Sequence, residues 1–312
     1  MLQQTRVEAV LAAFERFAAR YPTPAALADV SDDELQAAWR GLGYYRRARM
    51  LRDGARQVVE RHGGAVPADP EALGRLAGIG EYTRGAIASI AFGHVQPAVD
   101  GNVERVVARH RALTDDVKTT AARRAIRAQV IAWIDEARPG DFNQALMDLG
   151  ATVCTPRNPR CDACPVAADC EGRAQGIAAE LPKLPARRAA VPVTARAVLV
   201  RDTAGRVLAH RIEAGAVNAG QVELPGPGIL VDHPDTGAAL AASLERRFGA
   251  RFAVGEPVAT VRHGITHHRI TFVVHAAELT GRRPAALAFH APDDEAVPWS
   301  TPTRKALRAL PG

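Results

Sequence analysis

The sequence has little of what marks several classes of protein. Only four of its 312 residues are cysteine, all between positions 154 and 170, which argues against a disulfide scaffold. No stretch approaches the ~20 uncharged apolar residues that a membrane span needs. The first twenty residues contain Arg6, Glu8, Glu15 and Arg16, so they hold no uninterrupted apolar signal-peptide core. We therefore expect a cytoplasmic, nucleoid-associated protein with no membrane partner.

What the chain does contain is typical of a globular protein with a polyanionic partner. Hydrophobic residues make up 47% and charged residues 24%, a composition that excludes a disordered chain. The formal net charge is +6 and the isoelectric point is near 9.5, which favours nucleic acid as a partner. A chain of 312 residues has room for two domains of ordinary size.

The chain changes character after about residue 175. Residues 1–175 read as mostly helical with short Gly/Pro breaks, and the proline-rich LPKLPARRAAVP within residues 176–192 predicts a linker. Residues 193–312 alternate short β-rich runs with helices, one of them capped by Thr236 and ended by Gly249. The sequence therefore predicts a mainly α N-terminal domain and an α+β C-terminal domain.

The cysteines form one compact pattern, C-x6-C-x2-C-x5-C, at Cys154, Cys161, Cys164 and Cys170. Four thiols in one short loop indicate a single ligand set. Zinc is the alternative, but zinc ribbons use two C-x2-C knuckles and only Cys161 and Cys164 form one here. The spacing favours an iron–sulfur cluster over zinc.

Gly78 and Gly80 stand directly before an apolar-periodic helix in LAGIGEYTRGAIASIAF. Both glycines permit positive φ angles, and the free N–H groups at the start of the helix suit a phosphate. A plain turn between two helices is the alternative interpretation.

These motifs occur together in one family. The segments MLQQTRV, GLGYYRRAR, GIGEYTRGAI, VDGNVERV and FNQALMDLGATVCTPRNPRC resemble those of the helix-hairpin-helix DNA glycosylases related to endonuclease III, and most of all the adenine DNA glycosylases among them. The likeness covers nearly all of residues 1–175. Residues 193–312 resemble, more weakly, the lesion-reading C-terminal domain of the same proteins. The resemblance implies a helix-hairpin-helix glycosylase fold with a [4Fe-4S] cluster on the four cysteines.

The resemblance also implies two catalytic positions. Asp100 would stabilise the sugar cation formed when the N-glycosidic bond breaks, although the residue also suits an ordinary helix N-cap, and both roles can hold at once. Tyr82 stands where glycosylase/lyases of the superfamily carry a nucleophilic lysine. A tyrosine forms no Schiff base, so lyase chemistry is disfavoured.

The DNA contacts are implied in the same way. Tyr44 would insert beside the damaged guanine and Gln4, next to Gln3, would wedge into the base stack, where the alternatives are a core tyrosine and a solvated glutamine. The full set of implied DNA-contacting residues is Gln3, Gln4, Tyr44, Arg46, Gly78, Gly80 and Thr83.

In the second domain, Thr266 and His267 of RHGITHHRITF would read 8-oxoguanine, with an exposed edge strand as the alternative. The domain also resembles Nudix hydrolases in outline. Its helix AALAASLERRFG contains Glu245 as its one acidic residue, so pyrophosphatase activity on Mg²⁺ is not expected.

The resemblance implies a monomeric enzyme that removes adenine paired with 8-oxoguanine or guanine in double-stranded DNA. The family's general-acid glutamate would fall two residues before Met1, and Glu8 lies too far along the helix to replace it. We expect a start site placed too late or a trimmed chain. The alternatives are a lesion-binding remnant without activity and an endonuclease III-like glycosylase/lyase.

Overall fold

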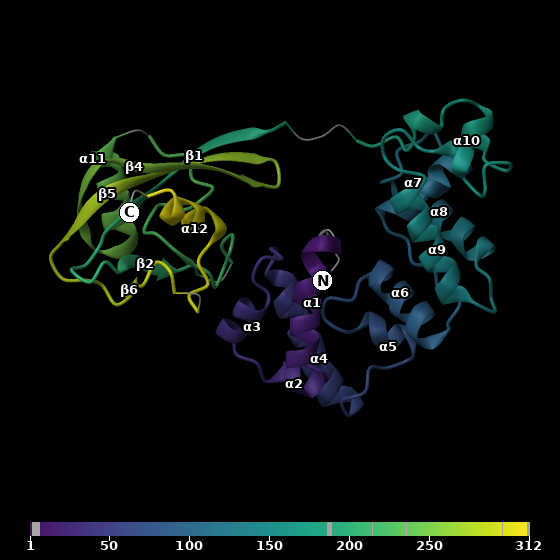
Figure 1. The fold of residues 1–312 in the computed structure, drawn as a ribbon, viewed down its shortest axis with the longest axis horizontal. Coiled ribbons are helices and arrows are strands. Elements are labelled where there is room, and N and C mark those ends of the chain that lie inside the picture. The colour runs from purple at the N-terminus through teal and green to yellow at the C-terminus, as the bar shows by residue number, and fades with distance from the viewer. Residues whose placement is uncertain (2–6, 186–188, 214, 235, 295, 311–312) are drawn as a thin grey trace. The chain divides into compact units, whose positions relative to one another are not determined.

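The computed structural model describes residues 1, 7–185, 189–213, 215–234, 236–294 and 296–310 (Figure 1). These residues form two compact units. One unit contains residues 1–20, 30–49 and 188–312, and the other contains residues 21–29 and 50–187. The boundaries predicted above follow chain order instead, and they stay a prediction.

Residues up to 180 are helical, as the sequence predicted. The helices are α1 (Val7–Arg20), α2 (Pro24–Ala28), α3 (Asp32–Ala38), α4 (Arg46–His62), α5 (Pro70–Gly74), α6 (Glu81–Phe92), α7 (Gly101–His110), α8 (Thr120–Trp133), α9 (Pro139–Thr152) and α10 (Glu171–Ala174), with the short 3₁₀ turns η1 (Cys161–Ala163) and η2 (Ala178–Glu180). Local side chains fix where several of them begin. Ser31, for example, caps α3 by accepting from the amide of Glu34, whose carboxylate accepts from Ser31 in return.

Helix α7 is the centre of the helical core in its unit. Val103, Val106 and Val107 are at most 4% exposed and pack with Ile126 and Val130 of α8. Helix α9 also packs against α7. Burial of these branched side chains holds α7 rigidly between its neighbours, so groups at its two ends keep a fixed separation.

The C-terminal region is an α+β unit with two three-stranded sheets. Its elements are β1 (Val191–Leu199), β2 (Val207–Arg211), β3 (Val222–Glu223), α11 (Gly237–Phe248), β4 (Arg251–Ile265), β5 (His268–Thr280), β6 (Leu287–His290) and α12 (Thr301–Arg308). The sheet orders are β1-β5-β4, with β1 parallel to β5, and β3-β2-β6. The predicted fold class, mainly α followed by α+β, is confirmed.

Helix α11 shows the two predicted end signals. Thr236 Oγ1 accepts from the amide of Ala239 at 3.2 Å, and Gly249 ends the helix at φ +65°. Leu240 and Leu244 of this helix are fully buried and pack against Phe252 of β4. None of the helices in the described part of the chain is long and apolar enough to cross a membrane.

Candidate functional site

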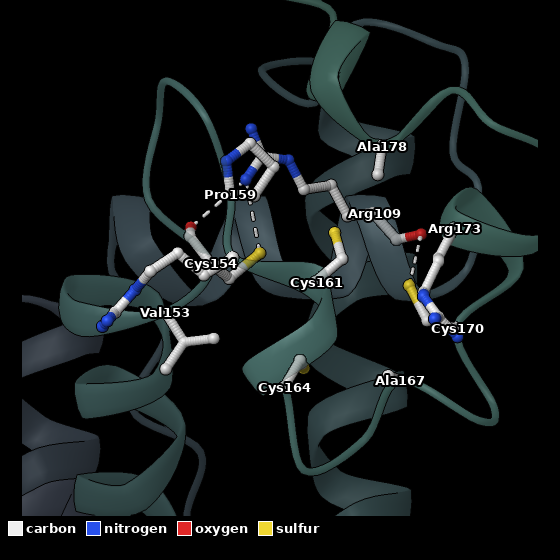
Figure 2. A pocket seen from close by; sticks show the side chains of 11 residues that line it. Arg109, Val153, Cys154, Pro159, Cys161, Cys164, Ala167, Cys170, Arg173 and Ala178 are labelled. Carbon is white, nitrogen blue, oxygen red and sulfur yellow. Dashed lines mark hydrogen bonds between the residues drawn. The ribbon is translucent and has the colours of Figure 1, made fainter.

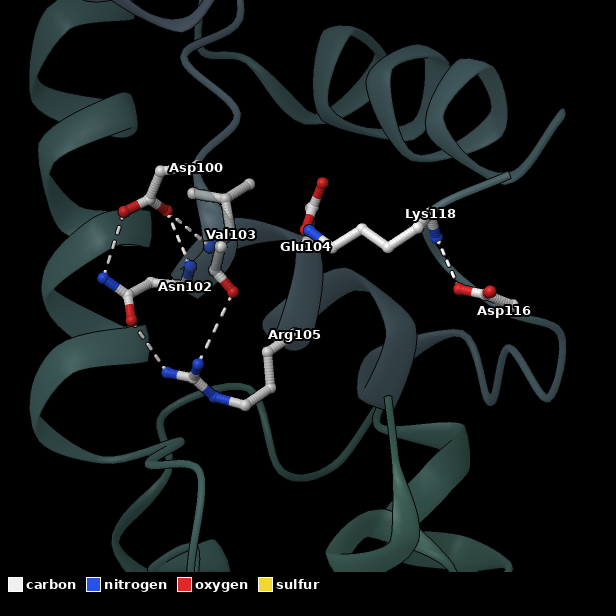
Figure 3. Close-up of polar contacts among 8 residues, drawn as sticks. Asp100, Asn102, Val103, Glu104, Arg105, Asp116 and Lys118 are labelled. Atoms are coloured by element: carbon white, nitrogen blue, oxygen red, sulfur yellow. Dashed lines mark hydrogen bonds and ion pairs between the residues drawn. The ribbon is translucent and has the colours of Figure 1, made fainter. Parts of the chain in front are cut away.

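Asp100 is the N-cap of α7, and its carboxylate is held by three hydrogen bonds. Oδ1 accepts from the backbone amides of Asn102 and Val103, each at 2.8 Å, and Oδ2 accepts from Asn102 Nδ2 at 3.0 Å (Figure 3). Both carboxylate oxygens are therefore fixed relative to the buried helix that follows. The N-cap interpretation is correct, and it leaves the carboxylate oriented for a second role.

Tyr82, on the first turn of α6, lies close to this carboxylate. Its phenol donates a hydrogen bond to Met147 Sδ at 3.3 Å. Burial, and then the negative charge of Asp100, raise the pKa of Tyr82. The structure thus brings the two predicted catalytic positions together from two different helices.

A chain of polar contacts continues from Asp100 along α7. Asn102 Oδ1 accepts from Arg105 Nη2 at 3.0 Å (Figure 3). Arg105 Nε donates to the carbonyl of Cys154 at 2.8 Å. The same guanidinium donates to the carbonyl of Gly150 at 2.7 Å. Asn102 and Arg105 were not predicted as functional residues. The sequence contains one indication of their role, which is that Arg105 stands among the valines of VERVVARH, the segment directly after Asn102.

The two glycines of the turn before α6 differ in backbone conformation. Gly78 has φ +82°, and a Cβ there would lie 3.1 Å from Met50 Cβ. Gly80 is extended, at φ −88° and ψ 179°, a conformation that any residue can adopt, so one of the two glycines uses the positive φ that the sequence permits. As N-cap of α6, Gly80 has no side chain and so supplies no side-chain hydrogen bond to the start of the helix.

The four cysteines line one small pocket (Figure 2). Cys154 follows α9, Cys161 begins η1, Cys164 follows it, and Cys170 precedes α10. Burial, and to a smaller extent the charges of the other cysteines, raise the pKa of the Cys164 thiol. Thiolates gathered in this way need positive charge among them.

Arg109 supplies part of that charge from the C-terminal turn of α7. It is 2% exposed, and its Nη1 donates to Cys154 Sγ at 3.3 Å (Figure 2). The same Nη1 donates to the Thr155 carbonyl at 2.7 Å. Its Nε donates to the carbonyl of Leu181 at 2.9 Å. A buried guanidinium with this many acceptors fixes the loop.

Tyr44 lies in the other compact unit, on the turn between α3 and α4. It is 58% exposed, so the alternative of a core tyrosine is wrong. Its backbone is in the left-handed region, at φ +46°. Trp39 Nε1 donates to the carbonyl of Gly43 at 3.0 Å, and the Arg47 guanidinium lies 5.6 Å from the centroid of the Tyr44 ring. The turn therefore presents an aromatic ring outward on a fixed backbone, followed by the exposed Arg46.

Thr266 and His267 form the turn between β4 and β5. Thr266 has φ +53°, its hydroxyl donates to the carbonyl of Ile265 at 2.7 Å, and it lies 3.3 Å from His267 Nδ1. The two side chains are thus at the tip of a hairpin and not inside an edge strand. Gln4, the predicted wedge residue, and its neighbour Gln3 lie outside the described residues.

Comparison with known proteins gives this arrangement its family. Residues 1–131 match the model of the HhH-GPD superfamily base excision DNA repair protein, a segment that contains Tyr82 and Asp100. The N-terminal region is thus similar to this superfamily. Residues 154–170 match the iron-sulfur binding domain of endonuclease III, and these are the bounds of the four-cysteine loop.

Several relatives are named adenine DNA glycosylase. The adenine DNA glycosylase of Homo sapiens is 49% identical over 174 residues, 55% of this chain and 32% of that protein. The adenine DNA glycosylase of Mycobacterium tuberculosis is 44% identical over 168 residues, 53% of this chain and 55% of that protein. Among solved structures, a thermostable thymine-DNA glycosylase is 27% identical with a TM-score of 0.52, over 56% of this chain and 80% of that one. The matched part of the chain spans about a third to a half of the curated relatives.

The cofactor of the loop is a [4Fe-4S] cluster, as predicted, and the residues present fit it. Four thiols face one cavity, the ligand number of a cluster with four cysteines. Arg109 adds a hydrogen bond to one of the sulfurs, an interaction that tunes such clusters. The match of the same seventeen residues to an iron-sulfur domain decides against zinc.

Proposed function

We propose that this chain is a monofunctional DNA glycosylase that removes adenine paired with 8-oxoguanine or guanine from double-stranded DNA. The observation that carries the proposal is the Asp100 carboxylate, oriented by three hydrogen bonds within the superfamily segment. We infer that the base removed is adenine because the relatives are named adenine DNA glycosylases. The enzyme acts as a monomer on the nucleoid in the cytoplasm.

Asp100 would stabilise the reaction by its charge. Cleavage of an N-glycosidic bond builds positive charge on C1′ of the sugar, and a fixed carboxylate beside that atom lowers the energy of the transition state. Adenine leaves after a general acid protonates its ring, and water then adds to the sugar cation and gives up a proton, so that the products are an abasic site and free adenine. Because the donors to Asp100 are in place before substrate arrives, no reorganisation is needed during the reaction.

The phenol of Tyr82 would restrict the reaction to base removal without strand cleavage. A phenol does not form the Schiff base through which a lysine would cut the strand, so the reaction ends at the abasic site. Its contact with Met147 leaves the ring beside Asp100, where a flipped nucleotide would lie.

The other predicted residues would hold the duplex. The amides after Gly78 and Gly80 would bind a phosphate, Tyr44 would enter the base stack, and Thr266 with His267 would contact the base opposite the adenine. Their exposure and their positions on turns support this assignment. The loaded [4Fe-4S] cluster would hold the loop of residues 154–170 in its folded form.

Adenine release tests the proposal directly. The chain, and in parallel the chain extended upstream through its own reading frame, is incubated with a duplex containing adenine opposite 8-oxoguanine. We expect the extended chain to release adenine from this duplex and not from a matched A·T duplex. Absence of release from both would contradict the proposal.

Two further outcomes separate the alternatives. A lyase would be trapped on DNA by borohydride through its Schiff base, whereas a chain with Tyr82 at that position should give no cross-link. A binding remnant would retain the lesion duplex in a gel-shift experiment, without release of adenine by either version of the chain.

A further inference from the structure

Helices α3 and α4, on either side of the turn that carries Tyr44, donate hydrogen bonds to a loop of the C-terminal region that belongs to the same compact unit as the turn. The loop, here named the docking loop, consists of residues 216–221 between β2 and β3. It is closed by backbone hydrogen bonds between Gly220 N and the carbonyl of Ile212, and between Ile212 N and the carbonyl of Gln221, both at 2.8 Å. Two consecutive carbonyls, of Ala219 and Gly220, accept hydrogen bonds from side chains.

Gln36 of α3 makes the most buried of these contacts. Its side chain is 4% exposed, and Nε2 donates to the carbonyl of Gly220 at 3.3 Å. Gly220 has φ +84°, and a Cβ at this position would lie 3.0 Å from Gln36 Nε2 and 3.6 Å from Arg49 Nη1. The loop backbone therefore comes this close to the helices because residue 220 is glycine.

Two arginines complete the contact. Arg49 Nη1, on the first turn of α4, donates to the carbonyl of Ala219 at 3.0 Å. Arg211 Nη1 donates to the carbonyl of Gly220 at 2.8 Å and forms an ion pair with Asp33 Oδ1 at 2.8 Å. An exposed ion pair alone contributes little. A buried amide together with charge-assisted bonds to fixed carbonyls gives a defined geometry.

The contacts lie on both sides of the Tyr44 turn. Gln36 precedes the turn on α3, and Arg49 follows it on α4. Between them, Tyr44 holds a left-handed backbone that is unfavourable for a bulky residue. Tyr45 is close enough to α12 for the charge of Arg304 to act on its phenol, whose pKa burial raises.

We propose that the docking loop is an internal interaction surface through which the C-terminal region positions Tyr44, by fixing α3 and α4 on either side of its turn. Gln36 is the positioning residue, and Gly220 is its partner. The part of this proposal that concerns DNA rests on the proposed function. Binding of the lesion by the C-terminal region would then be coupled to insertion of Tyr44 into the stack.

Hydrogen–deuterium exchange of the whole chain without DNA tests the docking itself. Gln36→Glu keeps the shape of the side chain but replaces the donor with a carboxylate that faces the Gly220 carbonyl. We expect faster exchange of amides both in residues 216–221 and in residues 42–49. Unchanged exchange in the docking loop would overturn the proposal, and faster exchange there without any change in residues 42–49 would overturn the positioning of Tyr44.

Matched variants keep this test specific. Gln57 uses its side-chain oxygen to accept from the amide of Ala77 at 2.7 Å, so Gln57→Glu retains its hydrogen bond and should leave both segments unchanged. Asp33→Lys replaces the exposed ion pair with Arg211 by two like charges. Because the position is exposed, misfolding is not expected, and amide exchange in the docking loop should become faster. Asp141→Lys makes the same change on the first turn of α9 and should not.

A double-mutant cycle then measures the coupling on DNA. The dissociation constant is determined for a duplex with 8-oxoguanine opposite an adenine analogue that is not cleaved. We expect Gln36→Glu to weaken binding about fivefold, and to have no further effect in the Tyr44→Ala background. Additive effects would overturn the coupling. If the unaltered chain shows no preference for the lesion duplex, the proposed function fails, while the exchange experiment still decides the docking.

Discussion

Arg105 donates a hydrogen bond from Nε to the backbone carbonyl of Cys154, 2.8 Å away. Through Asn102, the same guanidinium is connected to Oδ2 of Asp100. A continuous line of hydrogen bonds therefore runs from the first cysteine of the iron–sulfur loop to the candidate catalytic carboxylate.

The first prediction concerns Arg105. Arg105→Gln removes the hydrogen bonds that the guanidinium donates to the carbonyls of Gly150 and Cys154. The buried carbonyl of Gly150 then loses its partner on residue 105. We expect the thermal midpoint of the protein to fall by about 5 °C, because an unpaired buried acceptor costs a few kcal/mol. Iron and sulfide content per chain should fall as well. An unchanged midpoint with full iron would show that this guanidinium is dispensable.

The second prediction separates Asp100 from the cluster. Asn102→Ala removes the donor to Oδ2 and leaves the two backbone donors to Oδ1. Single-turnover adenine release should fall roughly ten- to a hundredfold, the value of one hydrogen bond to a charged group. Iron content should stay at the level of the unaltered chain. Loss of iron together with activity would instead indicate a structural role for Asn102.

The third prediction uses the difference between the two glycines of the turn. Gly78→Ala forces a side chain into positive φ and against Met50, so we expect the thermal midpoint to fall by about 4 °C. Gly80→Ala meets open space at an ordinary φ and should lower the midpoint by about 1 °C, the effect of a poorer N-cap. Equal effects of the two substitutions, measured by thermal unfolding, would contradict the geometry of the turn.

The fourth prediction concerns pH and a buried pair in the C-terminal region. Glu223 Oε1 lies 3.4 Å from His210 Nε2. Burial raises the pKa of Glu223 from 4.5 to about 7, and burial with the charge of Arg247 lowers that of His210 from 6.5 to about 4. Between pH 4.5 and pH 6.5 the folded pair and the unfolded chain each hold one proton, so the pair adds no pH dependence to stability there.

Glu223→Gln should expose the contribution of the histidine. His210 then stays neutral in the folded chain, whereas in the unfolded chain it takes up a proton below pH 6.5. The stability that depends on neutral His210 is present above pH 6.5 and is lost as the pH falls towards 4. The difference in thermal midpoint between variant and unaltered chain should therefore be larger at about pH 5 than at about pH 7. Glu245→Gln, on the exposed face of α11, is the control, and a difference that does not change with pH would contradict the assignment.

Local signals were the part of the fold that the sequence could predict. Thr236 and Gly249 mark the ends of α11 because capping depends on neighbouring residues alone, and the four cysteines form one loop because their spacing is short. Asp100 was predicted both as an N-cap and as a catalytic carboxylate. Strand β4 was not predicted, because its alternation is broken by a bulge near Pro257.

The rest depends on contacts between distant segments. Arg105 and Arg109 are charged, yet they are buried because carbonyls of the loop after α9 accept their hydrogen bonds. Nothing in the sequence near α7 indicates where those carbonyls lie. For the same reason the contact of Gln36 with Gly220, 184 residues away in the chain, could not be predicted.

The most direct test of the account compares the extended chain with its Asp100→Asn variant on a duplex with adenine opposite 8-oxoguanine. Single-turnover adenine release and the dissociation constant are measured for both. The account predicts that the substitution slows release by about 10²-fold or more while binding changes little, since the carboxylate acts on the transition state and not on the bound duplex. Equal rates of release for the two proteins would contradict it.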